Sequence, residues 1–295
     1  MENVDIIIRK VKKEPKPGSR VSNLSISLVQ GFYKSLSHIS PEVAAYLALE
    51  NFMRPKRYKE RVMESEIIRM GIQYKLPFLK GHLQMYEWKN KGPYILLVHG
   101  WDAAAANLAA FIPELINMGY SVLAFDAPAH GNSSGEKTNI IEYGTAISAV
   151  YKFIQPKAII AHSFGGSSTM FAIANQDFNP EKLISISAPS NLAEAVKRYT
   201  GFIQLTETAE EKVFERMRTI LGTDPGNLQV ENIAQKLPNS SLVIVHDRFD
   251  PVIPFYEAEN VYKVVRPSRF LITENFGHYK IVNDPEAIKK ILEYL

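Results

Sequence analysis

Over residues 66–295, short runs of apolar residues alternate with longer stretches in which apolar residues recur at helical spacing. Strands that are apolar at every position are typical of a parallel sheet covered by helices on both faces. The pattern therefore predicts an α/β fold, with a mostly parallel sheet flanked by helices. The predicted strands are 94–98, 121–125, 158–160, 183–186, 242–245 and 270–272, and the predicted helices are 103–118, 140–153, 167–175, 256–265 and 285–294. Segments 67–77 and 82–88 predict a pair of antiparallel strands.

The first 65 residues follow a different pattern and predict an N-terminal arm with a helical extension. Residues 1–20 mix charged residues with prolines, which predicts a loosely ordered, solvated arm, with contact to an anionic surface as the alternative. Apolar residues then recur at near-helical spacing over 21–39. Ser40-Pro41-Glu42 is typical of a second helix start, with serine as the N-cap and proline as the first helical residue.

One interval within the predicted domain at 66–295 is too long for a simple crossover between strands. Residues 190–238 predict two or three helices between two strands of the sheet. Ligands bind outside the carboxyl ends of the strands in open α/β sheets, so an insertion at this point is interpreted as a helical lid. A purely structural insertion is the alternative.

Composition narrows the class of protein without identifying a function. The 295 residues are 46% hydrophobic and 22% charged, with a net charge of +3, which is typical of a globular protein. The sequence lacks the dense basic stripe that would indicate nucleic-acid binding. None of its apolar runs is long enough to span a membrane. The chain has no cysteine, which excludes disulfides and a thiolate nucleophile. Without the pattern of a signal peptide at the N-terminus, a cytoplasmic protein is expected.

A candidate nucleophile lies at a predicted turn from strand to helix, in Ala161-His162-Ser163-Phe164-Gly165. A serine at such a sharp turn is typical of a nucleophile elbow. The turn brings the strand and the helix close together, so the positions two before and two after the serine require small side chains. Alanine and glycine at these two positions meet that requirement.

Backbone N–H groups for an oxyanion are expected on two segments next to this serine. His99-Gly100-Trp101 follows a predicted strand directly, and Gly100 allows a sharp turn that directs a main-chain N–H towards the cleft. Two such donors can stabilise the oxyanion formed in acyl transfer. We assign them to the backbones of Trp101 and Phe164, with a plain strand-end turn as the alternative for the first.

The segment from Asp126 to Ser133 contains Asp126 and His130, which are residue types that can bind a metal. No third ligand with suitable spacing accompanies them, so no metal site is predicted. The segment is interpreted as a loop that these residues brace through hydrogen bonds.

An acid and a base are expected at the ends of two later strands. Asp247 and Asp250 follow one strand, and His278 follows the last strand, after Gly277. Asp247 is adjacent to Arg248 and is interpreted as a structural partner of it, so Asp250 is the predicted acid. Since the carboxyl ends of parallel strands meet at one edge of a sheet, Ser163, Asp250 and His278 are expected to lie together.

On these motifs, residues 67–295 resemble the α/β-hydrolase superfamily, in which the nucleophile, acid and histidine occur in this chain order. The resemblance implies an α/β-hydrolase fold, with Ser163 as nucleophile, His278 as general base and Asp250 as its orienting acid. The same resemblance assigns a supporting role to His99, Gly100, His162 and Gly165. Ala161 departs from the usual glycine. Serine at position 163 argues against a dehalogenase or an epoxide hydrolase, which use a carboxylate nucleophile.

The resemblance implies a serine hydrolase that acts on a small acyl substrate without a cofactor. A carboxylic ester or thioester is favoured because aromatic side chains near the site predict an apolar surround. An acyltransferase or an amide or peptide hydrolase would use the same residues, and a non-catalytic binding protein on the same scaffold is the alternative from another class. The oligomeric state stays open.

Overall fold

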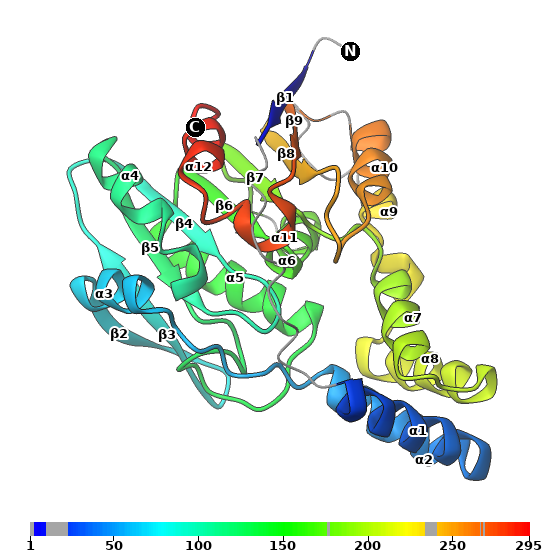
Figure 1. Cartoon of the computed structure of the whole chain (residues 1–295). Coiled ribbons are helices and arrows are strands. Elements are labelled where there is room, and N and C mark those ends of the chain that lie inside the picture. The colour runs from blue at the N-terminus through cyan, green and yellow to red at the C-terminus, as the bar shows by residue number, and fades with distance from the viewer. Residues whose placement is uncertain (1–2, 10–22, 176–177, 234–240, 266, 268) are drawn as a thin grey trace. The chain divides into compact units, whose positions relative to one another are not determined.

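In the computed structural model the described residues are 3–9, 23–175, 178–233, 241–265, 267 and 269–295. Over them the chain forms two compact units. The first contains Met1–Arg9, Pro55–Ser190 and Val230–Leu295, and the second contains Lys10–Arg54 and Asn191–Gln229. Figure 1 shows the strands and helices of the first unit around one sheet.

A nine-stranded sheet forms the centre of the first unit, in the order β1-β9-β8-β7-β6-β4-β5-β3-β2. Its strands are β1 (Val4–Ile8), β2 (Ile72–Phe78), β3 (Gly81–Trp88), β4 (Tyr94–Val98), β5 (Ser121–Phe125), β6 (Ala158–His162), β7 (Lys182–Ile186), β8 (Leu242–Asp247) and β9 (Arg269–Glu274). β2 pairs with β3 and β3 with β5 in antiparallel fashion, and the other neighbours are parallel. The predicted α/β class and its parallel strands are confirmed.

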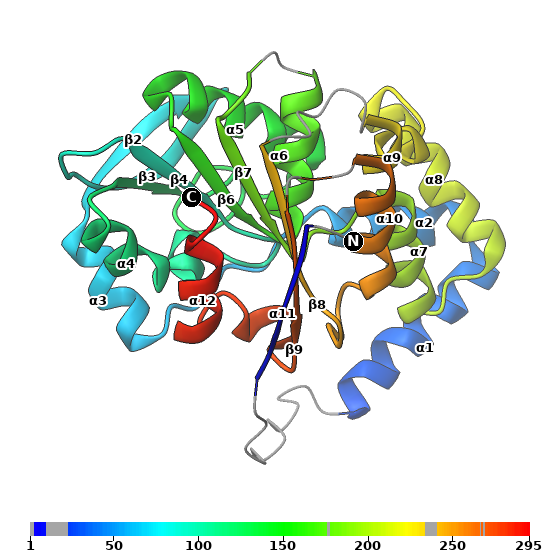
Figure 2. The same ribbon diagram turned by 90° about the horizontal axis from the view of Figure 1, so that it is seen from above.

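Helices cover both faces of this sheet, and Figure 2 shows α4 and α12 on one face and α5 and α6 on the other. The helices of the unit are α3 (Val62–Met70), α4 (Phe111–Asn117), α5 (Ile140–Ile154), α6 (Phe164–Asn175), α9 (Val230–Ile233), α10 (Phe255–Val265), α11 (Gly277–Lys280) and α12 (Pro285–Leu292), with a 3₁₀ turn at Ala105–Leu108. Alternate strand residues such as Leu97 and Ile160 form one core cluster with Phe111 of α4 and Ile288 of α12. Burying these apolar side chains between the sheet and the two helices stabilises this face of the sheet.

Three expectations for this unit are corrected by the structure. The arm predicted for residues 1–20 contains β1, whose residues Val4–Ile8 pair in parallel with β9; residues 1–2 and 10–22 of the predicted arm lie outside the described residues. The β-branched run Val-Asp-Ile-Ile-Ile suits such a strand better than a solvated arm.

The strand predicted from residue 67 begins only at Ile72, because residues up to Met70 belong to α3. Glu64 accepts a hydrogen bond from the Arg61 backbone N–H at 2.8 Å and stabilises the start of that helix. The helix predicted over 103–118 is interrupted between Leu108 and Phe111. Pro113 lacks an N–H and is tolerated only in the first turn, so a new helix begins just before it.

The second unit is helical and combines two segments that are far apart in the sequence. It contains α1 (Asn23–Ile39), α2 (Pro41–Phe52), α7 (Leu192–Phe202), α8 (Glu207–Leu221) and a 3₁₀ turn at Pro225–Leu228. The predicted cap of α2 is confirmed, since the Ser40 side chain accepts a hydrogen bond from the Val43 N–H.

Contacts between the helices show why the N-terminal extension and the inserted segment form one unit. Tyr199 of α7 donates a hydrogen bond to the Ala48 carbonyl of α2 at 3.1 Å. Lys212 of α8 pairs with Glu42 of α2 at 3.2 Å. The sequence treated the extension and the predicted lid as separate features, and nothing in their local patterns indicates this pairing. Residues 234–238 of the predicted lid lie outside the described residues.

Among the described residues, no helix has both the length and the apolar character needed to cross a lipid bilayer.

Candidate active site

Ser163 occupies a strained turn between β6 and α6. Its φ of 54° lies in the left-handed region, which is uncommon for a residue with a side chain. The Ser163 N–H donates to the Ile186 carbonyl of β7 at 2.8 Å, and its own carbonyl accepts from the Gly166 N–H at 2.9 Å. These bonds hold the turn at both ends and leave the Ser163 hydroxyl to project from it.

Two glycines after the serine allow α6 to approach the sheet. A Cβ at Gly165 would collide with the carbonyl oxygen of His99, and one at Gly166 would lie 2.7 Å from the Ala188 Cβ. Both positions therefore exclude larger side chains. Ala161, on the other side of the turn, is fully buried in β6. The small residues that the sequence predicted two positions before and two after the serine are thus present at Ala161 and Gly165.

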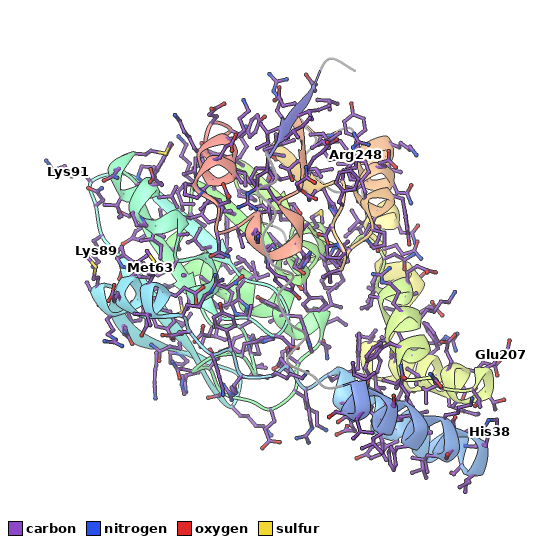
Figure 3. All side chains as sticks on the ribbon, viewed as in Figure 1. His38, Met63, Lys89, Lys91, Glu207 and Arg248 are labelled. Atoms are coloured by element: carbon purple, nitrogen blue, oxygen red, sulfur yellow. The ribbon has the colours of Figure 1, made fainter. Side chains whose placement is uncertain are left out.

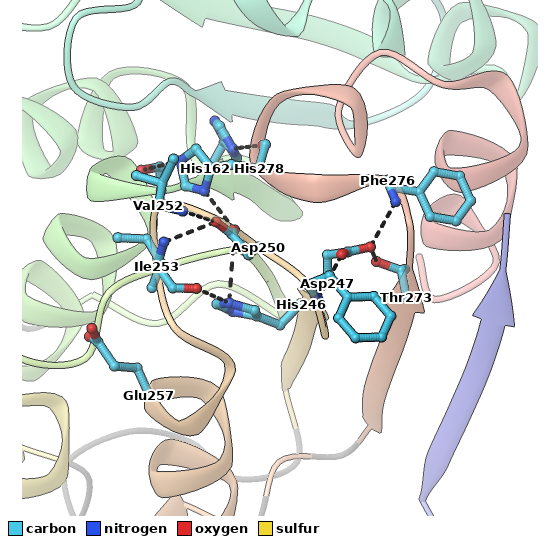
Figure 4. A network of polar contacts seen from close by, with 12 residues as sticks. His162, His246, Asp247, Asp250, Val252, Ile253, Glu257, Thr273, Phe276 and His278 are labelled. Carbon is cyan, nitrogen blue, oxygen red and sulfur yellow. Dashed lines mark hydrogen bonds and ion pairs between the residues drawn. The ribbon is translucent and has the colours of Figure 1, made fainter. Parts of the chain in front are cut away.

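The structure brings Ser163, Asp250 and His278 together from three strand ends. The Ser163 hydroxyl donates to Nε2 of His278 at 3.0 Å. Nδ1–H of His278 donates to Oδ2 of Asp250 at 2.7 Å, as Figure 4 shows. Both His278 and Asp250 are buried. This is the spatial arrangement that a serine nucleophile, a base and an orienting acid require.

Asp250 is held by the turn in which it lies. Its Oδ1 accepts hydrogen bonds from the backbone N–H groups of Val252 at 2.7 Å and Ile253 at 2.9 Å, which leaves Oδ2 for His278. Burial acts to raise the pKa of Asp250, but its bond to His278 and these two backbone donors outweigh burial and lower that pKa below its usual value. The carboxylate is therefore charged at neutral pH.

Two further histidines support this arrangement without taking part in it directly. Nε2–H of His162 donates to the backbone carbonyl of His278 at 3.0 Å, and Nε2–H of His246 donates to the Ile253 carbonyl at 3.0 Å. Burial, together with the neighbouring His278, lowers the pKa of His162 to about 3. Burial also lowers the pKa of His246. Both rings are neutral donors that fix the backbone around Asp250 and His278; the sequence identified His162 but not His246.

The predicted oxyanion segments lie directly beside the serine. A Cβ at Gly100 would be 2.9 Å from the Ser163 Cβ, so the backbone after β4 runs against the elbow. The rings of Trp101 and Phe164 meet edge to face, with their centroids 5.1 Å apart. As the first residue of α6, Phe164 has no acceptor for its N–H within the helix.

His99 supports the loop after β4 from inside the protein. Its Nδ1–H donates to the Gly100 carbonyl at 2.7 Å, and its Nε2 accepts from the Ala127 N–H at 3.0 Å. Tyr143, which the sequence did not single out, donates to the His99 carbonyl at 2.5 Å. Burial lowers the pKa of His99 to about 4, which keeps the ring neutral.

Asp126 braces the loop between β5 and α5, as predicted. Its carboxylate accepts from the Ala105 N–H at 2.8 Å, the Asn132 N–H at 2.8 Å and the Tyr86 hydroxyl at 2.9 Å. Arg57 donates to several backbone carbonyls of the same loop, including that of Ser133 at 3.1 Å. No pattern in the sequence links Arg57 to this loop.

The interpretation of Asp247 as a partner of Arg248 is wrong. The Arg248 guanidinium pairs with Glu274 at 3.0 Å. The Asp247 carboxylate instead accepts hydrogen bonds from Phe249, Thr273 and Phe276. Asp247 ends β8 and Arg248 follows it with its side chain directed to Glu274, so adjacency in sequence does not bring the two side chains together.

Residues 95–266 match the sequence model of the alpha/beta hydrolase family. The chain belongs to the alpha/beta hydrolase family.

Part of this chain is similar in sequence to characterised proteins. It is 27% identical over 193 residues to the lysophosphatidylserine lipase ABHD12 of Xenopus tropicalis, covering 61% of this chain and 48% of that protein. It is 25% identical over 228 residues to the Gallus gallus protein of the same name, covering 69% of this chain and 58% of that protein. The chain thus spans about half the length of these relatives.

Solved structures share the fold. The Pyrococcus furiosus esterase Pf2001 superposes with a TM-score of 0.63 at 18% identity, covering 82% of this chain and 96% of that one. A bacterial membrane phospholipase A superposes with a TM-score of 0.60 at 16% identity, covering 92% of this chain and 96% of that one. At such identities the likeness shows the α/β-hydrolase fold and not a substrate.

Proposed function

We propose that this alpha/beta hydrolase cleaves a carboxylic ester or thioester through an acyl-enzyme intermediate on Ser163. The observation that carries the proposal is the continuous hydrogen-bonded series Ser163–His278–Asp250, with distances of 3.0 and 2.7 Å. A serine is a weak nucleophile unless an adjacent base accepts its proton, and His278 is positioned to do so.

In the first step, Nε2 of His278 accepts the Ser163 proton while the serine Oγ attacks the carbonyl carbon of the substrate. The oxyanion that forms is stabilised by the backbone N–H groups of Trp101 and Phe164. Collapse of this intermediate breaks the bond to the alcohol or thiol, which leaves with the proton from His278. Water, deprotonated by His278, then releases the acid and restores Ser163.

Asp250 fixes the tautomer in which Nδ1 of His278 carries a proton and Nε2 is free to accept one. Its negative charge also stabilises the imidazolium that forms in each half of the reaction. The lowered pKa of Asp250 supports this role, because the carboxylate stays charged throughout the neutral pH range.

The substrate class is proposed more narrowly from the relatives. Two of them are named lysophosphatidylserine lipases, so single-chain acyl esters of polar head groups are the first candidates. An acyltransferase, or an amide or peptide hydrolase, would use the same three side chains. A lid role for the helices of the inserted segment and a cytoplasmic location both stay predictions.

The test is a panel of esters and thioesters of graded chain length, including lysophosphatidylserine, measured with the wild-type chain and with Ser163→Ala. Turnover of the best substrate is expected to fall by about six orders of magnitude in the variant, since the other residues cannot replace the nucleophile. An alcohol or amine acceptor in parallel reactions separates acyl transfer from hydrolysis. Retention of most of the activity in Ser163→Ala would rule out the proposed role.

A further inference from the structure

Asp247 is a buried carboxylate that the proposed mechanism does not use. It is the last residue of β8, and its side chain is fully buried. Placing a charged group inside a protein is unfavourable unless hydrogen bonds compensate for the lost hydration. The partners of this carboxylate therefore indicate what it does.

The two oxygens of Asp247 bind two different turns. Oδ1 accepts from the backbone N–H of Phe249 at 3.0 Å, in the turn that contains Asp250. Oδ2 accepts from the backbone N–H of Phe276 at 2.9 Å and from the Thr273 hydroxyl at 2.9 Å, in the segment that leads to His278. Figure 4 shows the bonds to Thr273 and Phe276 next to the contact between Asp250 and His278.

The segment that leads to His278 needs such support because its own backbone is strained. Asn275, with a φ of 72°, and Gly277, with a φ of 63°, lie in the left-handed region on either side of Phe276. A residue other than glycine persists in that region only where its surroundings hold it there. The Phe276 N–H bonded to Asp247 is an attachment point within this strained segment, two residues before His278.

The strand pairing brings this attachment point close to the acid. β8 and β9 are parallel neighbours, with Asp247 directly opposite Thr273. The Arg248 N–H donates to the Thr273 carbonyl at 2.7 Å, and the Asp250 N–H donates to the Asp247 carbonyl at 3.1 Å. Asp247 is thus bonded to the turn of the acid through its backbone and to both turns through its side chain.

We propose that Asp247 is a positioning residue that sets the distance and angle between Asp250 and His278. The inference rests on the proposed function, because its effect is exerted through that pair. Asp247 contacts neither the substrate nor Ser163 in this account. It holds the two turns so that the bond from Nδ1–H of His278 to Asp250 forms before the substrate arrives.

Asp247→Asn tests this with little change in volume. An amide has one acceptor oxygen, so its NH₂ group must face either the Phe249 or the Phe276 N–H, and one turn loses its partner. We expect kcat to fall about 100-fold with KM within about twofold, as for a small displacement of catalytic groups. Thr273→Val removes one of three donors and leaves both turns attached, so kcat is expected to fall only roughly fivefold.

The second readout of this test is an NMR resonance, which a loss of stability alone would not change. The proton that His278 Nδ1 shares with Asp250 is expected to give a far-downfield NMR resonance, identified by its absence in His278→Ala. In Asp247→Asn this resonance should move upfield or broaden away. Ile288→Val, on the core-facing side of α12, provides a destabilised control in which both kcat and the resonance should remain as in the wild type.

Two results would overturn the inference. One is an unchanged kcat and resonance in Asp247→Asn. The other is a loss of kcat that follows the melting temperature equally in Asp247→Asn and Ile288→Val while the resonance stays in place. If wild-type and Ser163→Ala proteins have equal turnover, the proposed function itself fails, so the two failures are distinguishable.

Discussion

The two sides of the site are built in different ways. On the elbow side, β6, α6 and the loop after β4 approach one another closely, and a Cβ at Gly100, Gly165 or Gly166 would lie less than 3.0 Å from a neighbouring atom. On the acid–base side, the ends of β8 and β9 are held by the buried carboxylates of Asp247 and Asp250, which accept backbone N–H groups. The elbow therefore depends on shape, and the acid–base side depends on charge and hydrogen bonding.

This comparison predicts different failures for small substitutions on the two sides. A methyl group added at the elbow should affect folding and activity together. Replacing an oxygen by an NH₂ group on the acid–base side should affect turnover while the protein stays folded.

After Ser163→Ala, the largest effect on turnover with an intact fold is expected for Asp250→Asn. The amide oxygen can still accept from Val252 and Ile253, so the turn is retained, but the NH₂ group then faces His278 and favours the wrong tautomer. We expect kcat to fall by about 10⁴-fold, as in other triads that lose the charge of the acid. Steady-state kinetics at pH 7 measure the loss of kcat, and far-UV circular dichroism at the same pH shows whether the fold is retained.

Asp224→Asn is the matched control for this variant. Asp224 also accepts a backbone N–H, from Gly226 at 2.8 Å, but it belongs to the second, helical unit of the chain. Its turnover should equal that of the wild type. A loss below tenfold in Asp250→Asn would show that the acid–base side does not depend on charge.

The next effect is expected for Gly165→Ala at the elbow. The new Cβ would meet the His99 carbonyl oxygen, which belongs to a fixed backbone and cannot move aside without displacing β4. We expect a loss of about 3 kcal/mol in the free energy of unfolding, together with most of the turnover. Urea denaturation measures the free energy of unfolding, and initial rates measure the turnover.

Ala161→Gly tests the opposite change at the same turn. Removing this buried methyl should cost about 0.5–1 kcal/mol through backbone entropy and leave turnover nearly unchanged. The dependence on shape would be contradicted if Gly165→Ala unfolded at the same urea concentration as the wild type with full activity.

A smaller effect is expected from the buried histidines when the pH is lowered. Burial lowers the pKa of His99 to about 4 from its usual 6.5. Below pH 6.5 the unfolded chain binds a proton at this residue, whereas the folded protein does so only near pH 4. The free energy of unfolding should therefore fall by up to about 1.4 kcal/mol per pH unit across this range for each such histidine.

His99→Gln should reduce that slope, because glutamine does not titrate. Denaturation at pH 7, 6 and 5 measures the slope, and the exposed His38 on α1, labelled in Figure 3, provides the control His38→Gln. The assignment would be wrong if His99→Gln and wild type lost stability in parallel on acidification.

Much of the sheet and the site could be predicted from the sequence because both depend on local patterns. Apolar runs identified the parallel strands, and Ser163, Asp250 and His278 each follow such a run. The topology of parallel strands then brings these residues to one edge. For this reason the sequence located a site whose members are up to 115 residues apart.

The parts that the sequence did not predict depend on distant partners. β1 forms the edge of the sheet by pairing with β9, and no local pattern in the sequence indicates this pairing. The extension and the inserted helices form one unit through side chains such as Tyr199 and Lys212. The partners of Asp247 are likewise set by the register of β8 and β9, so its neighbour Arg248 was a misleading guide.

The measurement that most directly tests the central claim is labelling of the folded protein with a fluorophosphonate, followed by peptide mass spectrometry. Such a probe reacts with a serine activated by an adjacent base. The account predicts modification at Ser163 in the wild type, and none at this residue in His278→Ala under the same conditions. Wild-type protein that stays unlabelled at Ser163, or equal labelling in His278→Ala, would contradict it.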